Sequence, residues 1–552
     1  MRSTLTLLLA LAPALVAMPA PAFAQERPVD GNDASEARSS ERGVDVAPYI
    51  EASQVVSAQI EPGDDVVTYT SLAAGVDAGF GGRYSAGSVS LRYERRIGYD
   101  DDVADTDTLT GVARASMAVA GPSLTVEAGG LASRTRVEGT GATSIGAFGG
   151  DDDSTSQLYS VYAGPAFQTE VGVAQVTGGY QLGYTRVESP DVLPVAPGAE
   201  PVDIFDESVT HRAGVRAGVA PDTVLPVGLG VGAGWNRQDV SNLDQRIDDA
   251  YVRADVTVPV SPNVALVGGV GYEDVEVSNR DAVRDADGVP VRGPDGRLVT
   301  DNSSPRQIAY ETDGLIWDAG VLWRPSRRTS LEAHVGRRYG STTYYGSLTY
   351  APRANIGLGV SAYDAINSFG GQVTGALADL GTDFDAFRNP ITGDLGGCVL
   401  GVEGDNCALA RLGSVRSGVF RNRVISVSLG GSAGRNFYGI GAGYDRRSFI
   451  AAENTVLASA DGVVDETFWV AAHAARQLDR QSQISFGGSA SLFQSGYDAG
   501  TESLGYSLSG AYNRNIVEGL TGTVALGLDG ITREDLPDYK AASALAGLRY
   551  TF

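Results

Sequence analysis

The side chains best suited to chemistry are few and scattered in this 552-residue chain. Runs of aspartate at 100–102, with Asp105 and Asp107, and at 151–153 offer carboxylate oxygens of the kind that bind Ca²⁺ or Mg²⁺. Their spacing does not match an EF-hand, and solvated loops are the alternative interpretation. No Ser/His/Asp grouping can be placed around the histidines, so we expect no enzyme and no bound cofactor, with divalent cations as candidate partners of the acidic loops. The three histidines fall on separate predicted strands: His211, His334 and His473.

Charged residues also recur at every second position of alternating segments. In one of them, Leu91 and Tyr93 fall on one face of a predicted strand and Arg92 and Glu94 on the other. An apolar face opposite a polar one is what a barrel wall between lipid and a lumen requires. The charges are then either a channel lining whose field selects solutes or cross-strand pairs that hold the wall. Strand parity predicts these lumen-lining residues: Arg92, Glu94, Arg96, Arg212, Arg216, Arg253, Asp255, Glu332, His334, Arg338 and Arg549.

The connections between the predicted strands alternate in length. Tight turns such as 120–123 and 433–436 are followed by connections that are mostly longer and acidic, such as 138–156 and 278–306. This alternation favours a transmembrane antiparallel up-and-down β-barrel over a soluble sandwich, in which nothing separates connections by parity. We expect an all-β fold of about 22 strands, within a range of roughly 20–24, because strand boundaries predicted from sequence are uncertain by a few residues.

The two ends of the chain predict its location. Residues 1–24 have the basic, apolar and small-residue regions of a secretory signal peptide, and the polar residues 25–43 predict a disordered periplasmic tail before a barrel at 44–552. The final segment, 543–552, alternates and ends on Tyr550 and Phe552. This ending resembles the closing strand of Gram-negative outer-membrane β-barrels, whose terminal Phe is part of the signal read by the barrel-assembly machinery. The resemblance implies an outer-membrane location among lipid and lipopolysaccharide.

The chain as a whole looks like a Gram-negative outer-membrane β-barrel of the β-barrel porin type, some members of which occur with exopolysaccharide genes. The resemblance rests on the signal sequence, the alternating strands and the ending at 548–552. Twenty-two strands would also be similar to TonB-dependent receptors, but those carry an N-terminal plug domain. Only residues 25–43 precede the first predicted strand here, which argues against TonB-linked transport.

The longest predicted connection, 366–414, contains both cysteines. Cys398 and Cys407 lie close together in an exported chain, so we expect a disulfide and no metal site. Residues 376–387 could form a short amphipathic helix. Two arrangements remain open: the connection folds inward and constricts the lumen, or it is a stapled surface loop over the barrel rim.

The charge balance limits the classes of function. The formal net charge is −25, whereas nucleic-acid-binding surfaces are basic, so no nucleic-acid partner is expected. The leading hypothesis is a porin-like channel for passive diffusion of small hydrophilic solutes, or a conduit for polysaccharide export. The alternative is a non-conducting structural or adhesive surface protein with acidic extracellular loops.

Overall fold

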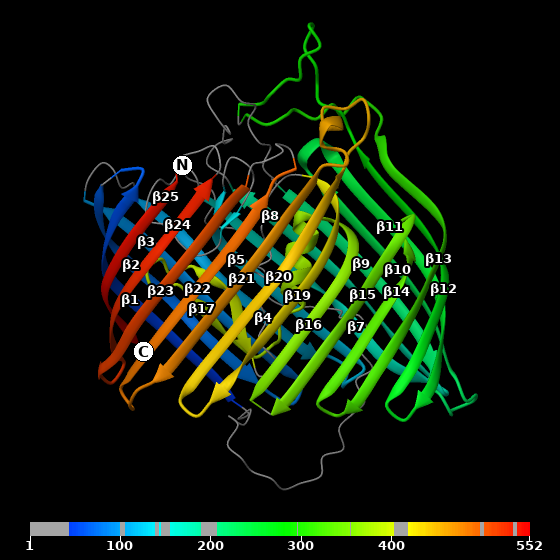
Figure 1. The fold of residues 1–552 in the computed structure, drawn as a ribbon, viewed down its shortest axis with the longest axis horizontal. Coiled ribbons are helices and arrows are strands. Elements are labelled where there is room, and N and C mark those ends of the chain that lie inside the picture. The colour runs from blue at the N-terminus through cyan, green and yellow to red at the C-terminus, as the bar shows by residue number, and fades with distance from the viewer. Residues whose placement is uncertain are drawn as a thin grey trace.

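The computed structural model shows a single ring of β-strands (Figure 1). It describes residues 43–63, 65–99, 105–137, 143–144, 155–188, 207–294, 296–353, 355–401, 418–496, 502–533 and 538–552. The wall strands are β1 (Gly43–Glu61), β2 (Val66–Gly81), β3 (Ser85–Gly98), β4 (Thr106–Ala118), β5 (Leu124–Val137), β7 (Thr155–Val171), β8 (Ala174–Glu188), β9 (Glu207–Val219), β10 (Gly228–Val240), β11 (Gln245–Ser261), β12 (Val264–Asn279), β13 (Gln307–Ser326), β14 (Thr329–Arg338), β15 (Ser341–Arg353), β16 (Ile356–Ser368), β19 (Val419–Ala433), β20 (Asn436–Ile450), β21 (Val464–Gln477), β22 (Ser482–Gln494), β23 (Glu502–Val517), β24 (Leu520–Arg533) and β25 (Tyr539–Thr551). The other elements are β6 (Thr143–Ser144), α1 (Phe369–Ala378), β17 (Phe384–Arg388), β18 (Leu395–Gly401) and the short 3-10 helices η2 (Asn242–Asp244) and η4 (Ala458–Ala460).

Hydrogen bonds between neighbouring strands run around the whole ring. Each wall strand pairs antiparallel with the next, and β1 pairs with β25 to close the ring, with Ala52 opposite Leu548. Two insertions interrupt the sequence order without opening the ring: β6 lies between β5 and β7, and α1, β17 and β18 lie between β16 and β19. Closure removes the exposed edges that a sheet would otherwise present. The prediction of an antiparallel barrel of about 22 strands is therefore confirmed.

Most short connections lie at one end of the barrel and the longer ones at the other (Figure 1), although the loop end also holds tight turns such as residues 339–340. The turn end holds most of the tight turns and the C-terminus; β4, for example, ends at Ala118 and β5 begins at Leu124. The loop end holds the longer connections, including residues 280–306, which project from the ring in green. In the described part of the chain, this separation follows the predicted parity.

The outer face of the ring is apolar. In β1, Ile50 is 52% exposed and the preceding Tyr49 is 2% exposed, and the same alternation continues through the wall. Exposed apolar side chains at every second position form a surface suited to lipid, and the paired strands satisfy their backbone hydrogen bonds within the wall. None of the described helices is long and apolar enough to cross a membrane.

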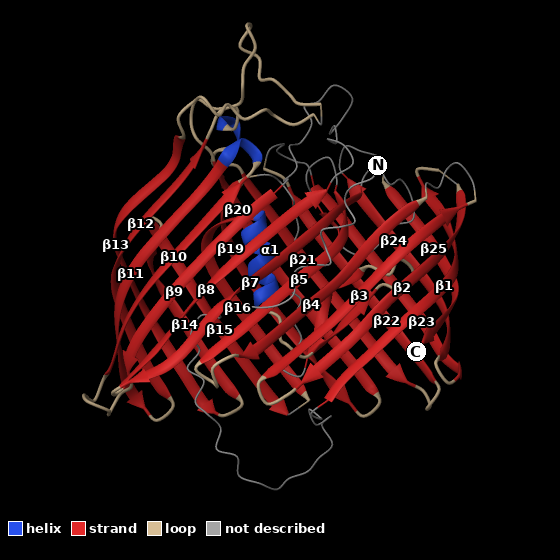
Figure 2. Ribbon diagram, turned by 180° about the vertical axis from the view of Figure 1, so that it is seen from behind, coloured by secondary structure: helices blue, strands red, loops and turns tan. Residues whose placement is uncertain are grey.

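The chain between β16 and β19 folds into the ring. Figure 2 shows α1 inside the barrel, where it contacts β5, β7, β8, β9 and β16. The Ser368 hydroxyl caps the helix by accepting a hydrogen bond from the Gly371 N–H at 3.2 Å. Phe369, Val373 and Leu377 are buried in one cluster with wall residues, and each such side chain contributes roughly 1.5–3 kcal/mol when fully buried.

This arrangement corrects two sequence predictions. The helix spans Phe369–Ala378, whereas residues 376–387 were expected to be helical, and Phe384–Arg388 is instead a strand that pairs with β18. Residues 369–396 lie inside the ring, so for them the rim arrangement is wrong, while constriction of the lumen stays a prediction. The physical reason is the pairing of apolar helix residues with an apolar patch on the inner wall, which the sequence of the loop alone does not reveal.

Candidate transport path

The first group of predicted lumen residues lies beneath the inner segment, residues 369–396. Arg92 forms ion pairs with Glu51 at 2.9 Å and Glu94 at 3.0 Å, and Glu94 also pairs with Arg96 at 2.9 Å. Arg96 in addition donates to the Thr392 carbonyl at 3.4 Å. These side chains are buried, so in this sector the charges tie the wall to the inner segment.

Three further arginines, which the sequence analysis did not name, make the same kind of contact. Arg134 on β5 pairs with Asp394 at 2.9 Å, and Arg114 on β4 donates to the Leu380 carbonyl. Arg388 on β17 reaches back to the Ser90 hydroxyl at 3.1 Å. Strand parity would have identified the two wall residues, since they share a face with inward neighbours. Nothing in the sequence marks Arg388.

The second group forms a chain of charges across β9, β11, β13 and β14, here called the charge ladder. It consists of Arg216, Asp255, Arg253, Asp318, His334 and Glu332. Successive ion pairs join its members: Arg216–Asp255 at 2.6 Å, Arg253–Asp255 at 2.8 Å and Arg253–Asp318 at 2.6 Å. His334 continues it, with Nδ1 at 3.0 Å from Asp318 and Nε2 at 3.1 Å from Glu332.

Two members of this sector were missed by sequence reasoning. Asp318 accepts from both Arg253 and His334, and the ring of Tyr345 stacks on His334 with centroids 4.4 Å apart. Asp318 occupies an inward position of β13, so parity carried a signal for it. The sequence pattern around Tyr345 fits an aromatic residue at the membrane interface equally well. Its place in the lumen is shown only by its contact with His334.

The remaining predicted residues lie apart from both groups. Arg338 pairs with Asp249 at 2.7 Å near the loop end, and Arg549 pairs with Asp77 at 2.7 Å. Arg212 lies beside α1, where a Cβ built on Gly375 would be 3.9 Å from its guanidinium. The predicted set therefore forms several local networks around the ring and no single site.

The two main groups differ in their contact with water. The side chain of Glu94, beneath the inner segment, is 4% exposed, whereas Arg216 and Glu332 in the charge ladder are 24% and 31% exposed. Among the described residues, the inner segment forms hydrogen bonds with β3, β4, β5, β8, β9, β20 and β23 but with none of the ladder residues. Asp255 and His334 in the middle of the ladder are buried (2% and 3%), so water reaches the ladder mainly at its ends, and it also reaches Arg549, which is 33% exposed.

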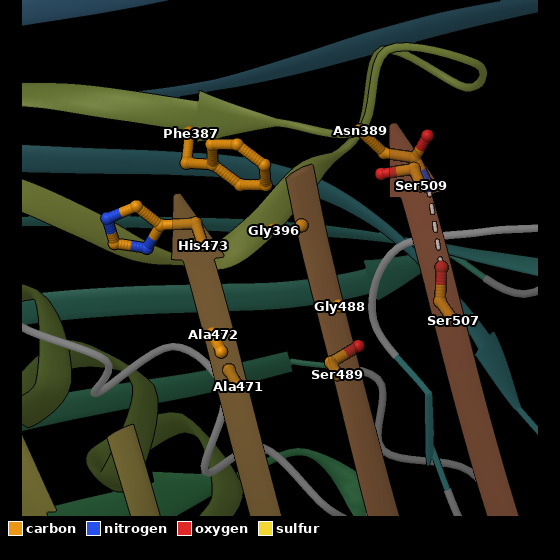
Figure 3. Close-up of a pocket in the computed structure, with 11 residues that line it drawn as sticks. Phe387, Asn389, Gly396, Ala471, Ala472, His473, Gly488, Ser489, Ser507 and Ser509 are labelled. Atoms are coloured by element: carbon orange, nitrogen blue, oxygen red, sulfur yellow. Dashed lines mark hydrogen bonds between the residues drawn. The ribbon is translucent and has the colours of Figure 1, made fainter. Parts of the chain in front are cut away.

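A small pocket separates the inner segment from β21–β23 (Figure 3). The Phe387 ring stacks on His473 with centroids 5.3 Å apart, and a Cβ on Gly487 would overlap that ring. Neither ring nitrogen of His473 has a hydrogen-bond partner among the described residues. The space for the centre of a water molecule is ≈ 20 Å³, about enough for one water. The pocket is therefore a packing contact of the inner segment and is too small for a solute.

Several predictions fall on other parts of the chain. The Cys398–Cys407 disulfide stays a prediction, because Cys407 lies outside the described residues, as do residues 1–42, which hold the predicted signal peptide and almost all of the predicted tail, and residues 100–102 and 151–153. Of the acidic positions that are described, Asp105 and Asp107 both pair with Arg95. Within the described ranges no group of three or more His, Cys, Asp or Glu residues is placed to hold a metal ion.

The C-terminal aromatics lie at the turn end. The Tyr550 and Phe552 rings meet edge to face with centroids 5.0 Å apart, and the Phe552 N–H donates to the Pro48 carbonyl at 3.0 Å. Phe552 is exposed. An exposed terminal ring at this position is accessible to a partner protein, and its part in barrel assembly stays a prediction.

Together, the closed ring, the apolar outer face and the charged interior define a transmembrane β-barrel of the outer-membrane type. No family model matches the sequence, and no curated protein matches it. The chain is distantly similar in structure to the FrpB iron transporter of Neisseria meningitidis, with a TM-score of 0.43 and 9% identity over 93% of this chain and 83% of that one. It is also similar to the ferric-catecholate import receptor Fiu of E. coli (0.42, 8%, 91% and 81%) and the siderophore receptor PiuA of Acinetobacter baumannii (0.40, 9%, 91% and 82%). Similarities this low carry no argument about what this barrel transports, and the porin type stays a prediction.

Proposed function

We propose that this protein is a passive channel for small hydrophilic solutes, constricted by the inner segment. The observation that carries the proposal is the charge ladder, a row of paired charges on the inner wall that the inner segment does not cover and whose two ends, Arg216 and Glu332, are in contact with water. A row of fixed charges along an aqueous path favours ions and polar solutes over apolar ones. A ring of this size without an inner segment would leave a wide aqueous hole.

The inner segment supplies the sieve in this mechanism. It is anchored by Arg134 and Asp394 and by the apolar cluster around α1, and it also contacts β20 through Gln372 and β21 through Phe387. Solutes would pass between it and the ladder, without covalent chemistry and without a bound group. A polysaccharide conduit is the other transport candidate, and it would require the inner segment to move aside for a chain of sugars.

Replacing residues 379–396 with a short Gly/Ser linker tests the proposal. Because the constriction is removed, single-channel conductance in a planar bilayer should rise several-fold above that of the unmodified protein. Shortening the projecting loop between Arg284 and Leu298 is the matched control, since that loop lies outside the ring, and it should leave conductance unchanged.

A second candidate is a non-conducting surface protein. Buried apolar clusters favour it, because they fill the space inside the wall around α1 and join β11 and β12 to β16 and β19 at the loop end. Purified protein that is folded, as shown by heat-modifiable migration on gels, but silent in the bilayer both before and after linker replacement would support this candidate and overturn the channel.

A further inference from the structure

One pair of neighbouring strands separates partway up the wall. β15 and β16 pair only from Gly346 opposite Ala362 down to Arg353 opposite Ile356. Above that point β15 continues to Ser341 and β16 continues to Ser368, yet the two strands form no further ladder. Unpaired edges are costly near a membrane and demand another partner.

The upper part of β16 and β19 has turned into the barrel. Ile366 and Val419 occupy the strand face that points outward lower down, where Ile425 is exposed. Here that face is buried against Ile247 and Val275, which project from the inner face of β11 and β12. The upper wall is therefore double in this sector, with β16 and β19 inside β11 and β12.

A polar contact reinforces the double layer. The Val419 N–H donates to the Gln245 side-chain carbonyl at 3.2 Å, although β19 and β11 are not neighbours in the ring. On β11, Arg253 and Asp255 of the charge ladder lie nearer the turn end than Ile247. The apolar contact therefore lies across the path from the ladder to the loop end.

The tip of the β14–β15 hairpin is also bound to β11 and β12. Tyr339 is buried with a φ of 53°, a left-handed conformation that a bulky residue adopts only when its contacts impose it. Its hydroxyl donates to Asp249 at 3.0 Å and its N–H donates to Glu273 at 2.7 Å. The hairpin tip is thus fixed to the inner face of β11 and β12.

Two arginines replace the missing ladder between β15 and β16. Arg421 pairs with Asp364 at 2.6 Å and donates to the Thr342 carbonyl at 3.3 Å, and Arg423 donates to the same carbonyl at 3.1 Å. Asp364 accepts from both guanidinium groups. This group, Asp364, Arg421 and Arg423, is here called the seam latch.

We propose that residues 363–368 and 419–423 form a gate that closes the path at the loop end. In the open state these segments leave β11 and β12 and move back toward β15, so that the β15–β16 ladder extends. Continuing the observed register would place Tyr344 opposite Asp364 and Thr343 opposite Ala365. New hydrogen bonds in that ladder then replace the apolar packing against β11 and β12, which gives the fold two packings of one segment. The gate rests on the proposed channel, whose regulation it supplies.

Weakening the latch tests the gate. Asp364→Asn removes the charge that holds both arginines, so the fraction of time spent open in a bilayer should rise several-fold. Arg446→Gln is the matched control, because Arg446 makes a looser pair with Glu466 at 3.8 Å on a neighbouring strand, and it should leave gating unchanged. Hydrogen–deuterium exchange gives a readout that needs no current: uptake by residues 419–423 should rise in Asp364→Asn only.

A reversible cross-link distinguishes closure of the gate from poor folding of a variant. Cysteines at Gln245 and Val419, joined after reconstitution by a spaced bis-thiol reagent with a reducible bond, should abolish current, and reduction should restore it. Wild-type protein treated in the same way controls for the native cysteines. Current that persists through the lock, with uptake unchanged in Asp364→Asn, overturns the gate and leaves the channel standing. Raised uptake in a barrel that never conducts overturns the channel and leaves the movement standing.

Discussion

At the scale of single residues, glycines on the inner wall allow the inner segment to pack closely, and charged residues there form ion pairs. Phe387 can lie against β22 only because Gly487 has no side chain, and the facing Gly396 is equally close, with a Cβ there 2.6 Å from the same ring. Buried charged residues such as Glu94 and Arg96 are paired, which offsets the cost of removing each from water. Position on the wall therefore decides whether a residue anchors the inner segment or faces the lumen.

Gly487→Ala should loosen the inner segment. The added methyl overlaps the Phe387 ring, so either the ring or the hairpin must move, at a cost of about 1–3 kcal/mol of stability. Denaturant unfolding in detergent measures the loss, and hydrogen exchange of residues 384–388 localises it. Gly268→Ala is the control, since nothing lies within 4 Å of a Cβ there. Equal effects of the two substitutions would contradict the packing role of Gly487.

At the scale of elements, the wall strands could be predicted and the inner segment could not. Alternation in β3 and β11 follows from contact with lipid on one face, a local rule that each strand obeys by itself. The helix at Phe369–Ala378 is stabilised by Leu131, Leu158 and other residues far away in sequence. Because the position of the helix depends on those distant residues, the local sequence pattern predicted a helix too far toward the C-terminus, at residues 376–387. We identified no sequence signal for the inward bend of the upper part of β16.

The loop end also has an electrostatic contact between connections. Asp281 accepts from Arg284 at 3.1 Å and from the Val456 N–H at 2.9 Å, which ties residues 280–306 to the β20–β21 connection. Partial burial raises the pKa of Asp281, but these hydrogen bonds outweigh burial and hold its pKa below the ordinary value. A carboxyl with a lowered pKa stabilises the folded contact above its ordinary pKa, and the stabilisation disappears as the pH falls through the lowered pKa.

Asp281→Asn should weaken this contact at neutral pH by about 1 kcal/mol and remove its loss in acid. Hydrogen exchange at residues 455–458, followed from pH 7 into the acid range, reports it. Asp301→Asn should have no effect on those residues, because the Asp301 side chain bonds within its own loop to Ser303. An acid loss that persists unchanged in Asp281→Asn would show that another group controls the contact.

At the scale of the whole molecule, the interior has two unequal parts. One part is filled by the inner segment and held by buried ion pairs such as Arg134–Asp394; the other is lined by the charge ladder, whose ends are exposed. Parity predicted charged residues in both parts without separating them, because each strand presents the same alternation whether or not something covers it. The two parts of the interior can be distinguished only when the position of the inner segment is known.

The most direct test of this account is the effect of a charged thiol reagent on single-channel current at two positions. Glu332→Cys lies in the ladder and Glu94→Cys lies beneath the inner segment, and unmodified protein controls for the native cysteines. A positively charged methanethiosulfonate should attach to Glu332→Cys and change its current in steps, while Glu94→Cys conducts unaltered. Modification that alters current at Glu94→Cys but not at Glu332→Cys would contradict the account.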